Sequence, residues 1–124
     1  MNVTAAKVVV YGGAGNNTIN LGSNTAQTRI MLQQGGVDQI NGFNLHNGDV
    51  LDFSTLLAET RVSLADLNSL GTYLQVSASG TNATLSYNPA GLAAGGGAAV
   101  AVLHGVGTGI TLGTLISDNV LKIS

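Results

Sequence analysis

The sequence predicts a mostly β domain, a β-roll or β-sandwich of short strands with two short helices. Three observations support this prediction. Most of the 124 residues are Gly, Ala, Ser, Thr and Asn together with Val, Ile and Leu, a mixture that favours short strands joined by tight turns. Several short segments alternate apolar and polar side chains with the period of a β-strand. Glycine-rich segments separate these alternating segments.

In the first half of the chain, four segments have strand character, and the polar turn between the last two contains Asn47 and Gly48. Two short strands around such a turn predict either a β-hairpin or two successive coils of a roll. The expected strands are Val3–Tyr11, Thr28–Gln33, Gln39–Phe43 and Asp49–Phe53.

The second half is expected to begin with a short helix that Ser63 caps and Gly71 ends. The clearest hairpin of the chain follows, because both of its strands alternate well around a Ser-Gly-Thr-Asn turn. A Gly/Ala-rich loop separates this hairpin from the C-terminal elements. The expected elements are the helix Leu64–Leu70, the strands Tyr73–Ser79 and Ala83–Asn88, the loop Pro89–Gly97, the strand Ala98–Leu103, the helical turn Leu112–Ile116 and the strand Val120–Ile123.

The composition argues against several function classes. Charged residues are only 8% of the chain, against about 25% in typical soluble domains. With four Lys and Arg and a net charge of −2, no nucleic-acid partner is expected. No apolar run of about 18 residues is present, so membrane insertion is not expected. The chain has no cysteine and therefore no disulfide.

Catalytic signatures are also missing from the sequence. Glu59 is the only glutamate, and no second carboxylate near it suggests an acid/base pair. The glycines after Tyr11 lack the Lys-Ser/Thr ending of a phosphate-binding loop. His46 and His104 are far apart in sequence, so a transition-metal site is not expected. We therefore predict a non-enzymatic protein.

Two segments have the chemistry of a Ca²⁺ site. Residues 12–20, GGAGNNTIN, fit the nonapeptide G-G-x-G-x-D-x-U-x, with Asn17 at the aspartate position and Ile19 at the apolar position. In that repeat, the glycines form a tight turn whose carbonyls point inward, and Ca²⁺ is held between successive turns. The candidate ligands of this segment are Gly13, Gly15 and Asn17. The alternative is a glycine-rich turn that binds no metal.

The second segment, Gly35–Leu57, contains three of the six acidic residues of the chain. Carboxylates are the preferred ligands of Ca²⁺, so Asp38, Asp49 and Asp52, with Gly36, complete the predicted metal site. Each of two carboxylates also has a structural alternative: Asp52 accepts backbone N–H bonds at the turn to Ser54, and Asp49 is an ordinary turn residue.

The order of these motifs resembles the C-terminal target domain of proteins that bacterial type I secretion exports, in particular the domain that ends large RTX adhesins and related surface proteins. The resemblance covers the chain from about Gly12 to its end. Its most specific parts are GDVLDFS at residues 48–54 and YLQVSASGTNATLS at residues 73–86.

This resemblance implies an extracellular or cell-surface protein of a Gram-negative bacterium. It also implies an uncleaved export signal near the C-terminus, which an ABC transporter and its adaptor read together with an outer-membrane channel. The domain would fold outside the cell on meeting Ca²⁺. We expect a single domain, 1–124, with an RTX-like glycine-turn roll in 1–60 and a β-hairpin part with the export signal in 61–124, as a fragment of a larger protein.

The sequence departs from the family where asparagine stands at acidic positions, as at Asn17 and Asn41. Since Ca²⁺ affinity depends on the charge of the ligands, the sites are expected to be fewer and weaker, or the domain folds without metal. Two other functions stay open. One is a self-assembling surface-layer or biofilm module that pairs through strand edges. The other is a carbohydrate-binding accessory module of a secreted enzyme, with Tyr11, Tyr73 and Tyr87 as candidate sugar contacts.

Overall fold

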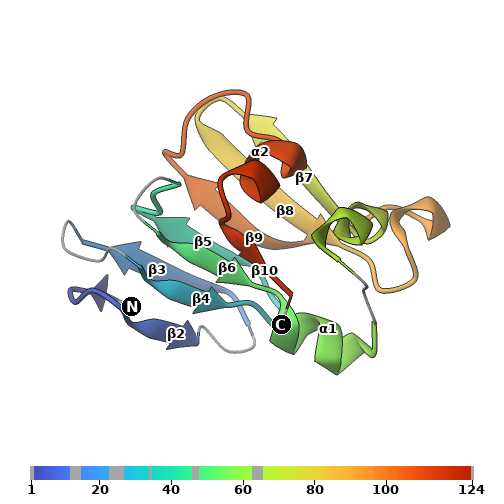
Figure 1. Ribbon diagram of the computed structural model, residues 1–124, viewed down its shortest axis with the longest axis horizontal. Helices are drawn as coiled ribbons and strands as arrows, with labels where there is room; N and C mark the ends of the chain where they lie inside the picture. The colour runs from blue at the N-terminus through green and yellow to red at the C-terminus, as the bar shows by residue number, and fades with distance from the viewer. Residues whose placement is uncertain are drawn as a thin grey trace.

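The computed structural model describes residues 2–11, 15–22, 27–33, 35–45, 48–62 and 66–123. The chain is mostly β, with strands in two sheets, as the sequence predicts. It winds back and forth between the sheets, so that each coil gives one strand to each sheet (Figure 1). The described part of the chain contains no helix long and apolar enough to cross a membrane.

Four coils make up the roll. Coil 1 contains β1 (Asn2–Val3) and β2 (Val9–Tyr11), coil 2 contains β3 (Asn17–Leu21) and β4 (Arg29–Met31), coil 3 contains β5 (Asp38–Asn41) and β6 (Val50–Asp52), and coil 4 contains β9 (Ala98–His104) and β10 (Leu121–Lys122). Strands of neighbouring coils pair in parallel, in the orders β1-β3-β5-β9 and β2-β4-β6-β10.

A longer excursion separates coil 3 from coil 4. It contains the helix α1 (Ser54–Thr60), the 3-10 helix η1 (Leu67–Thr72), the hairpin of β7 (Leu74–Ser79) and β8 (Asn82–Tyr87), and the 3-10 helix η2 (Leu92–Ala94). The hairpin is antiparallel, and β8 pairs antiparallel with β9. The hairpin therefore extends one sheet to six strands, while the other sheet has four. The helix α2 (Leu112–Ser117) connects β9 to β10.

The core consists of apolar residues stacked at equivalent positions of successive coils. In the six-stranded sheet Ile19 pairs in register with Ile40, and Ile40 pairs with Leu103. In the four-stranded sheet Ile30 pairs with Leu51. All five side chains are fully buried. Burial of such a side chain stabilises a fold by about 1.5–3 kcal/mol, so this stacking holds the coils together. The position expected for Ile19 in the core is confirmed.

Several predictions about individual elements are confirmed and others are wrong. The segment expected as one strand from Val3 to Tyr11 is two short strands in different sheets. Lys7, with φ of 58°, lies in the turn between them, because the chain has to cross from one sheet to the other. Both alternatives for residues 39–53, a hairpin and two successive coils, are wrong in this respect: β5 and β6 belong to different sheets and are the two strands of one coil of the roll, coil 3.

In the second half, the hairpin, the helical turn at 112–116 and the final strand are confirmed. The expected helix Leu64–Leu70 is instead the 3-10 helix η1, which begins after Asp66 and includes Gly71. Asp66 caps η1 by accepting a hydrogen bond from the Ser69 N–H, at 3.0 Å. Ser63, the expected cap, lies outside the described residues.

Candidate functional site

The three carboxylates predicted to bind metal lie at three different places on the roll. Asp38 begins β5 in the six-stranded sheet, Asp49 precedes β6, and Asp52 ends β6 in the four-stranded sheet. All three are buried. Among the described residues, no three His, Asp or Glu side chains come together in a group that could hold a metal ion.

Asp49 holds together two segments of backbone. Its Oδ1 accepts a hydrogen bond from the Thr28 N–H at 3.1 Å, and its Oδ2 accepts one from the Asn44 N–H at 3.0 Å. Thr28 belongs to coil 2 and Asn44 to coil 3, so this fully buried carboxylate links neighbouring coils as well as shaping its own turn. These bonds support the alternative in which Asp49 is a structural turn residue and not a metal ligand.

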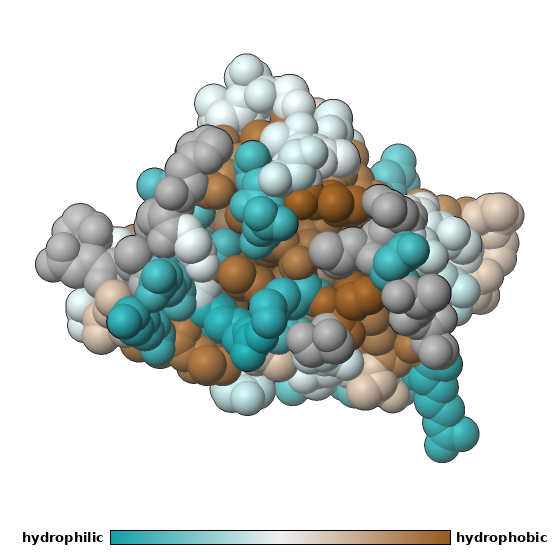
Figure 2. Space-filling model, viewed as in Figure 1, coloured by the Kyte–Doolittle hydropathy of each residue, from teal (hydrophilic) through white to brown (hydrophobic). Residues whose placement is uncertain are grey.

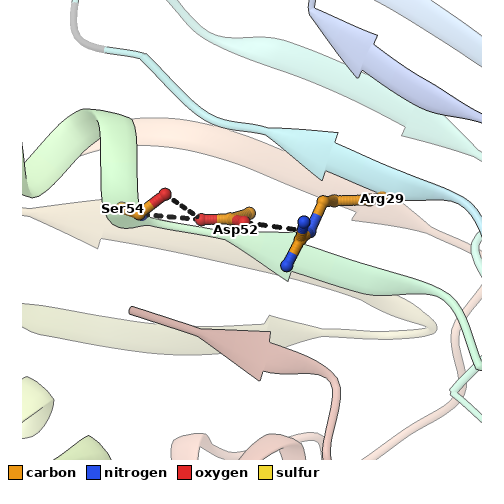
Figure 3. Close-up of polar contacts among 3 residues, drawn as sticks. All are labelled: Arg29, Asp52 and Ser54. Atoms are coloured by element: carbon orange, nitrogen blue, oxygen red, sulfur yellow. Dashed lines mark hydrogen bonds and ion pairs between the residues drawn. The ribbon is translucent and has the colours of Figure 1, made fainter. Parts of the chain in front are cut away.

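Asp52 also has both oxygens engaged (Figure 3). Its Oδ1 accepts hydrogen bonds from the Ser54 N–H at 2.8 Å and the Ser54 hydroxyl at 2.5 Å. Its Oδ2 lies 3.0 Å from Nε of Arg29, on the neighbouring strand β4. The expected backbone N–H bond to Asp52 at the turn into α1 is confirmed. The ion pair with Arg29 was not predicted, because it depends on the register of β4 against β6.

Asp38 lies at a corner of the roll with Gly15, Asn17 and Gly36, which we call the coil corner. The Asn17 Nδ2 donates to Oδ1 of Asp38 at 3.1 Å and to the Gly15 carbonyl at 3.2 Å. Burial raises the pKa of the Asp38 carboxyl, and the hydrogen bonds from the side chain and backbone of Asn17 act in the opposite direction. Of the predicted metal ligands, Gly15, Asn17, Gly36 and Asp38 are thus brought together, whereas Gly13 lies outside the described residues.

The glycines of the coil corner allow two turns of backbone to approach closely. A Cβ added at Gly36 would lie 2.1 Å from the Gly15 carbonyl oxygen, which is far inside van der Waals contact. The Gly15 N–H donates to the Gly35 carbonyl across the same contact, at 3.1 Å. Coil stacking therefore explains the glycine at position 36 without any metal.

Sequence reasoning missed a set of side-chain bonds that join coil 2 to coil 3. Asn16 Oδ1 accepts from the Val37 N–H at 2.8 Å, and Asn41 Nδ2 donates to Asn20 Oδ1 at 2.8 Å. These two pairs are 21 residues apart in sequence (37 − 16 and 41 − 20). The pairs Asn17–Asp38 and Thr28–Asp49 have the same separation. We call these four pairs the inter-coil ladder.

A weak signal of this ladder exists in the sequence. The segments NTIN at 17–20 and DQIN at 38–41 follow Gly15 and Gly36 at the same distance. They pair residue by residue in the six-stranded sheet. A search for internal repeats at a spacing of 21 residues would have found this correspondence.

The described residues do not fit a Ca²⁺ site. Ca²⁺ requires six to eight oxygen ligands, usually with several carboxylates. Asp49 and Asp52 direct their oxygens at N–H and O–H groups, and the guanidinium of Arg29 beside Asp52 repels a cation. At the coil corner, Asn17 directs its Nδ2 donor at the Gly15 carbonyl and at Asp38. Ca²⁺ binding stays a prediction of the family resemblance.

Other residues that the sequence drew attention to have structural partners. His104 Nε2 forms a hydrogen bond with Oε1 of Gln39 on the adjacent strand. Tyr87 is buried, and its hydroxyl lies 2.6 Å from the Thr60 hydroxyl of α1. Burial raises the pKa of Tyr87. Tyr11, in contrast, is 58% exposed on the edge strand β2.

In comparisons with known proteins, no family model, no curated protein and no solved structure matches the chain.

Proposed function

We propose that the chain is a non-enzymatic C-terminal target domain of type I secretion, which belongs to an extracellular RTX-type protein of a Gram-negative bacterium. Its partners would be the secretion ABC transporter and its adaptor. The observation that carries the proposal is the equivalence of two segments, one that follows Gly15 and one that follows Gly36. Residues 17–20 and 38–41 pair in register on successive coils, as expected if both descend from one glycine-turn repeat.

The weakly charged surface departs from the acid-rich family that the chain resembles, whereas the arrangement of the coils fits the proposed role. Charged residues are few in the whole sequence, and the face in Figure 2 shows scattered hydrophilic clusters among pale and apolar residues. Parallel coils also suit a chain that is threaded through a channel and folds afterwards, because each coil can add to the one already formed.

An export assay tests the proposal. A cargo protein is fused to the N-terminal side of residues 1–124 and expressed with a type I transporter, its adaptor and an outer-membrane channel. The expected result is cargo in the medium. Three controls are matched to the mechanism: cargo alone, the fusion without the transporter, and a fusion with the domain on the N-terminal side of the cargo. Retention of the C-terminal fusion at the level of these controls would reject the proposal.

A second candidate function, self-association with another copy, is favoured by the outer edge of coil 1. Val9 and Tyr11 on β2 are 47% and 58% exposed, and they are the large apolar side chains exposed within the described residues. They border an open groove of about 470 Å³ that Val3, Ala5 and Val8 also line. The other edge of coil 1 already pairs in parallel with coil 2, and a second copy could continue that pairing.

Sedimentation velocity over a range of protein concentrations tests self-association. The expected result is a concentration-dependent dimer that Val9→Lys and Tyr11→Lys abolish, since a lysine on an edge strand blocks pairing. Ala58→Lys, which adds the same single positive charge at an exposed position on α1, serves as the charge-matched control. A chain that stays monomeric at all concentrations would reject this candidate and leave the export proposal unaffected.

A further inference from the structure

The coil corner holds two oxygen atoms of successive turns near a single nitrogen. The Gly15 carbonyl comes from coil 2 and the Asp38 carboxylate from coil 3, and Asn17 Nδ2 donates a hydrogen bond to each. An amide NH₂ group has two donors, which match these two acceptors. The opposite orientation of the amide would place Asn17 Oδ1 against two oxygens, which is unfavourable unless a cation lies between them.

An aspartate at position 17 would remove the side-chain donor of both hydrogen bonds. A carboxylate has no donor, so its oxygens would face the Gly15 carbonyl and the buried Asp38 carboxylate without the two side-chain hydrogen bonds, and its charge would repel that of Asp38. A divalent cation between these three oxygens would offset the repulsion. The nonapeptide G-G-x-G-x-D-x-U-x has aspartate at this position and uses Ca²⁺ between turns.

We propose that the Asn17 side-chain amide takes the place of a divalent cation at the coil corner. Coils 2 and 3 therefore stay joined without metal, and a carboxylate at position 17 converts the corner into a Ca²⁺-dependent contact. This inference does not rest on the export proposal, because it concerns how the roll is held together and not where it is sent.

The rest of the inter-coil ladder supports the same conclusion. Beside the coil corner, Asn16 accepts the Val37 N–H, and further along the strands Asn41 donates to Asn20. Asparagine amides thus take part in three of the four pairs of the inter-coil ladder. In the fourth pair, Asp49 accepts backbone N–H groups. The Arg29–Asp52 ion pair joins the same two coils on the other sheet, and there the guanidinium supplies the positive charge.

The test compares the melting temperatures of three proteins in EGTA and in about 5 mM Ca²⁺, a concentration suited to extracellular sites. The wild-type protein is expected to melt at the same temperature in both. Asn17→Asp is expected to melt on the order of 5 °C lower in EGTA and to recover much of that loss in Ca²⁺. Asn20→Asp adds the same charge at a link whose partner is the neutral Asn41, and it is expected to show no Ca²⁺ response.

A fourth protein covers the case in which Asn17→Asp does not fold in EGTA. The double variant Asn17→Asp/Asp38→Asn exchanges the carboxylate and the amide, which restores one donor–acceptor pair between the coils. It is expected to fold in EGTA and to respond to Ca²⁺ no more than the wild-type protein. The proposal is overturned if the wild-type protein needs Ca²⁺ to fold, or if Asn17→Asp shows no larger Ca²⁺ shift than Asn20→Asp.

Discussion

Replacement of Gly36 by alanine should separate coils 2 and 3 at the coil corner. The added Cβ would lie 2.1 Å from the Gly15 carbonyl oxygen, 2.2 Å from its carbon and 2.7 Å from its Cα. Backbone on both sides of this contact has to move, because no flexible side chain is there to yield. Gly36 does not have a positive φ, so the penalty comes from space and not from the backbone conformation of alanine.

The magnitude follows from the bonds that this movement breaks. The hydrogen bonds that cross the corner include those from the Gly15 N–H to the Gly35 carbonyl, from the Val37 N–H to Asn16, and from the Asn17 side chain to Asp38. At about 0.5–1.5 kcal/mol each, their loss lowers the free energy of unfolding by about 2–4 kcal/mol. This is a large part of the 5–15 kcal/mol that is typical of a small domain.

Equilibrium unfolding in urea, followed by circular dichroism, measures this loss. Gly113→Ala is the matched control, because it is the same chemical change on the exposed face of α2, where the new Cβ would lie 3.8 Å from its nearest neighbour, Thr111 Oγ1. The control should be stabilised by up to about 1 kcal/mol, as alanine is the better helix former. A Gly36→Ala protein within about 0.5 kcal/mol of wild type would refute the close approach of the two coils.

Three further predictions concern buried polar groups. Asp49→Ala removes the acceptor of the Thr28 and Asn44 N–H groups and should cost about 2–4 kcal/mol in urea unfolding, and a loss below about 1 kcal/mol would contradict its role as a link. Burial raises the pKa of Asp38, so the folded state keeps the proton on this carboxyl to a higher pH than the unfolded chain does. The contribution of Asp38 to the free energy of unfolding therefore falls as the pH rises above about 4. Asp38→Asn keeps an acceptor for Asn17 and should remove that part of the pH dependence, whereas a constant difference from wild type between pH 4 and pH 7 would argue against it. Tyr87→Phe and Thr60→Val should each cost about 1 kcal/mol and couple in a double-mutant cycle, and simple additivity would show that their hydroxyls do not interact.

Local sequence patterns predicted the parts of the fold that local physics determines. The hairpin of β7 and β8 follows from strict alternation around a short turn, and Ile19 follows from its place after the glycines. The turn into α1 was also within reach, because Asp52 and Ser54 are two residues apart.

Long-range pairing was not predictable in the same way. Coil 4 completes the roll although Ala101 is 63 residues from its partner Asp38 (101 − 38), with a helix and a hairpin between them. Coil 1 divides into β1 and β2 at the turn that contains Lys7. The valine-rich sequence after this turn is typical of one continuous strand, so it did not indicate that the chain crosses between the sheets. The metal prediction rested on residue types alone, whereas the roles of Asp49 and Asp52 depend on N–H groups and an arginine that the register brings to them.

Successive coils of the roll are joined by the protein's own hydrogen bonds. Native-state hydrogen exchange, measured by NMR in EGTA, tests this most directly at the amides of Gly15, Thr28 and Val37, each of which donates to the neighbouring coil. We expect these three amides to exchange more slowly than in the unfolded chain, and at the same rates after Ca²⁺ is added. Unprotected exchange in EGTA, with protection that appears only in Ca²⁺, would contradict it.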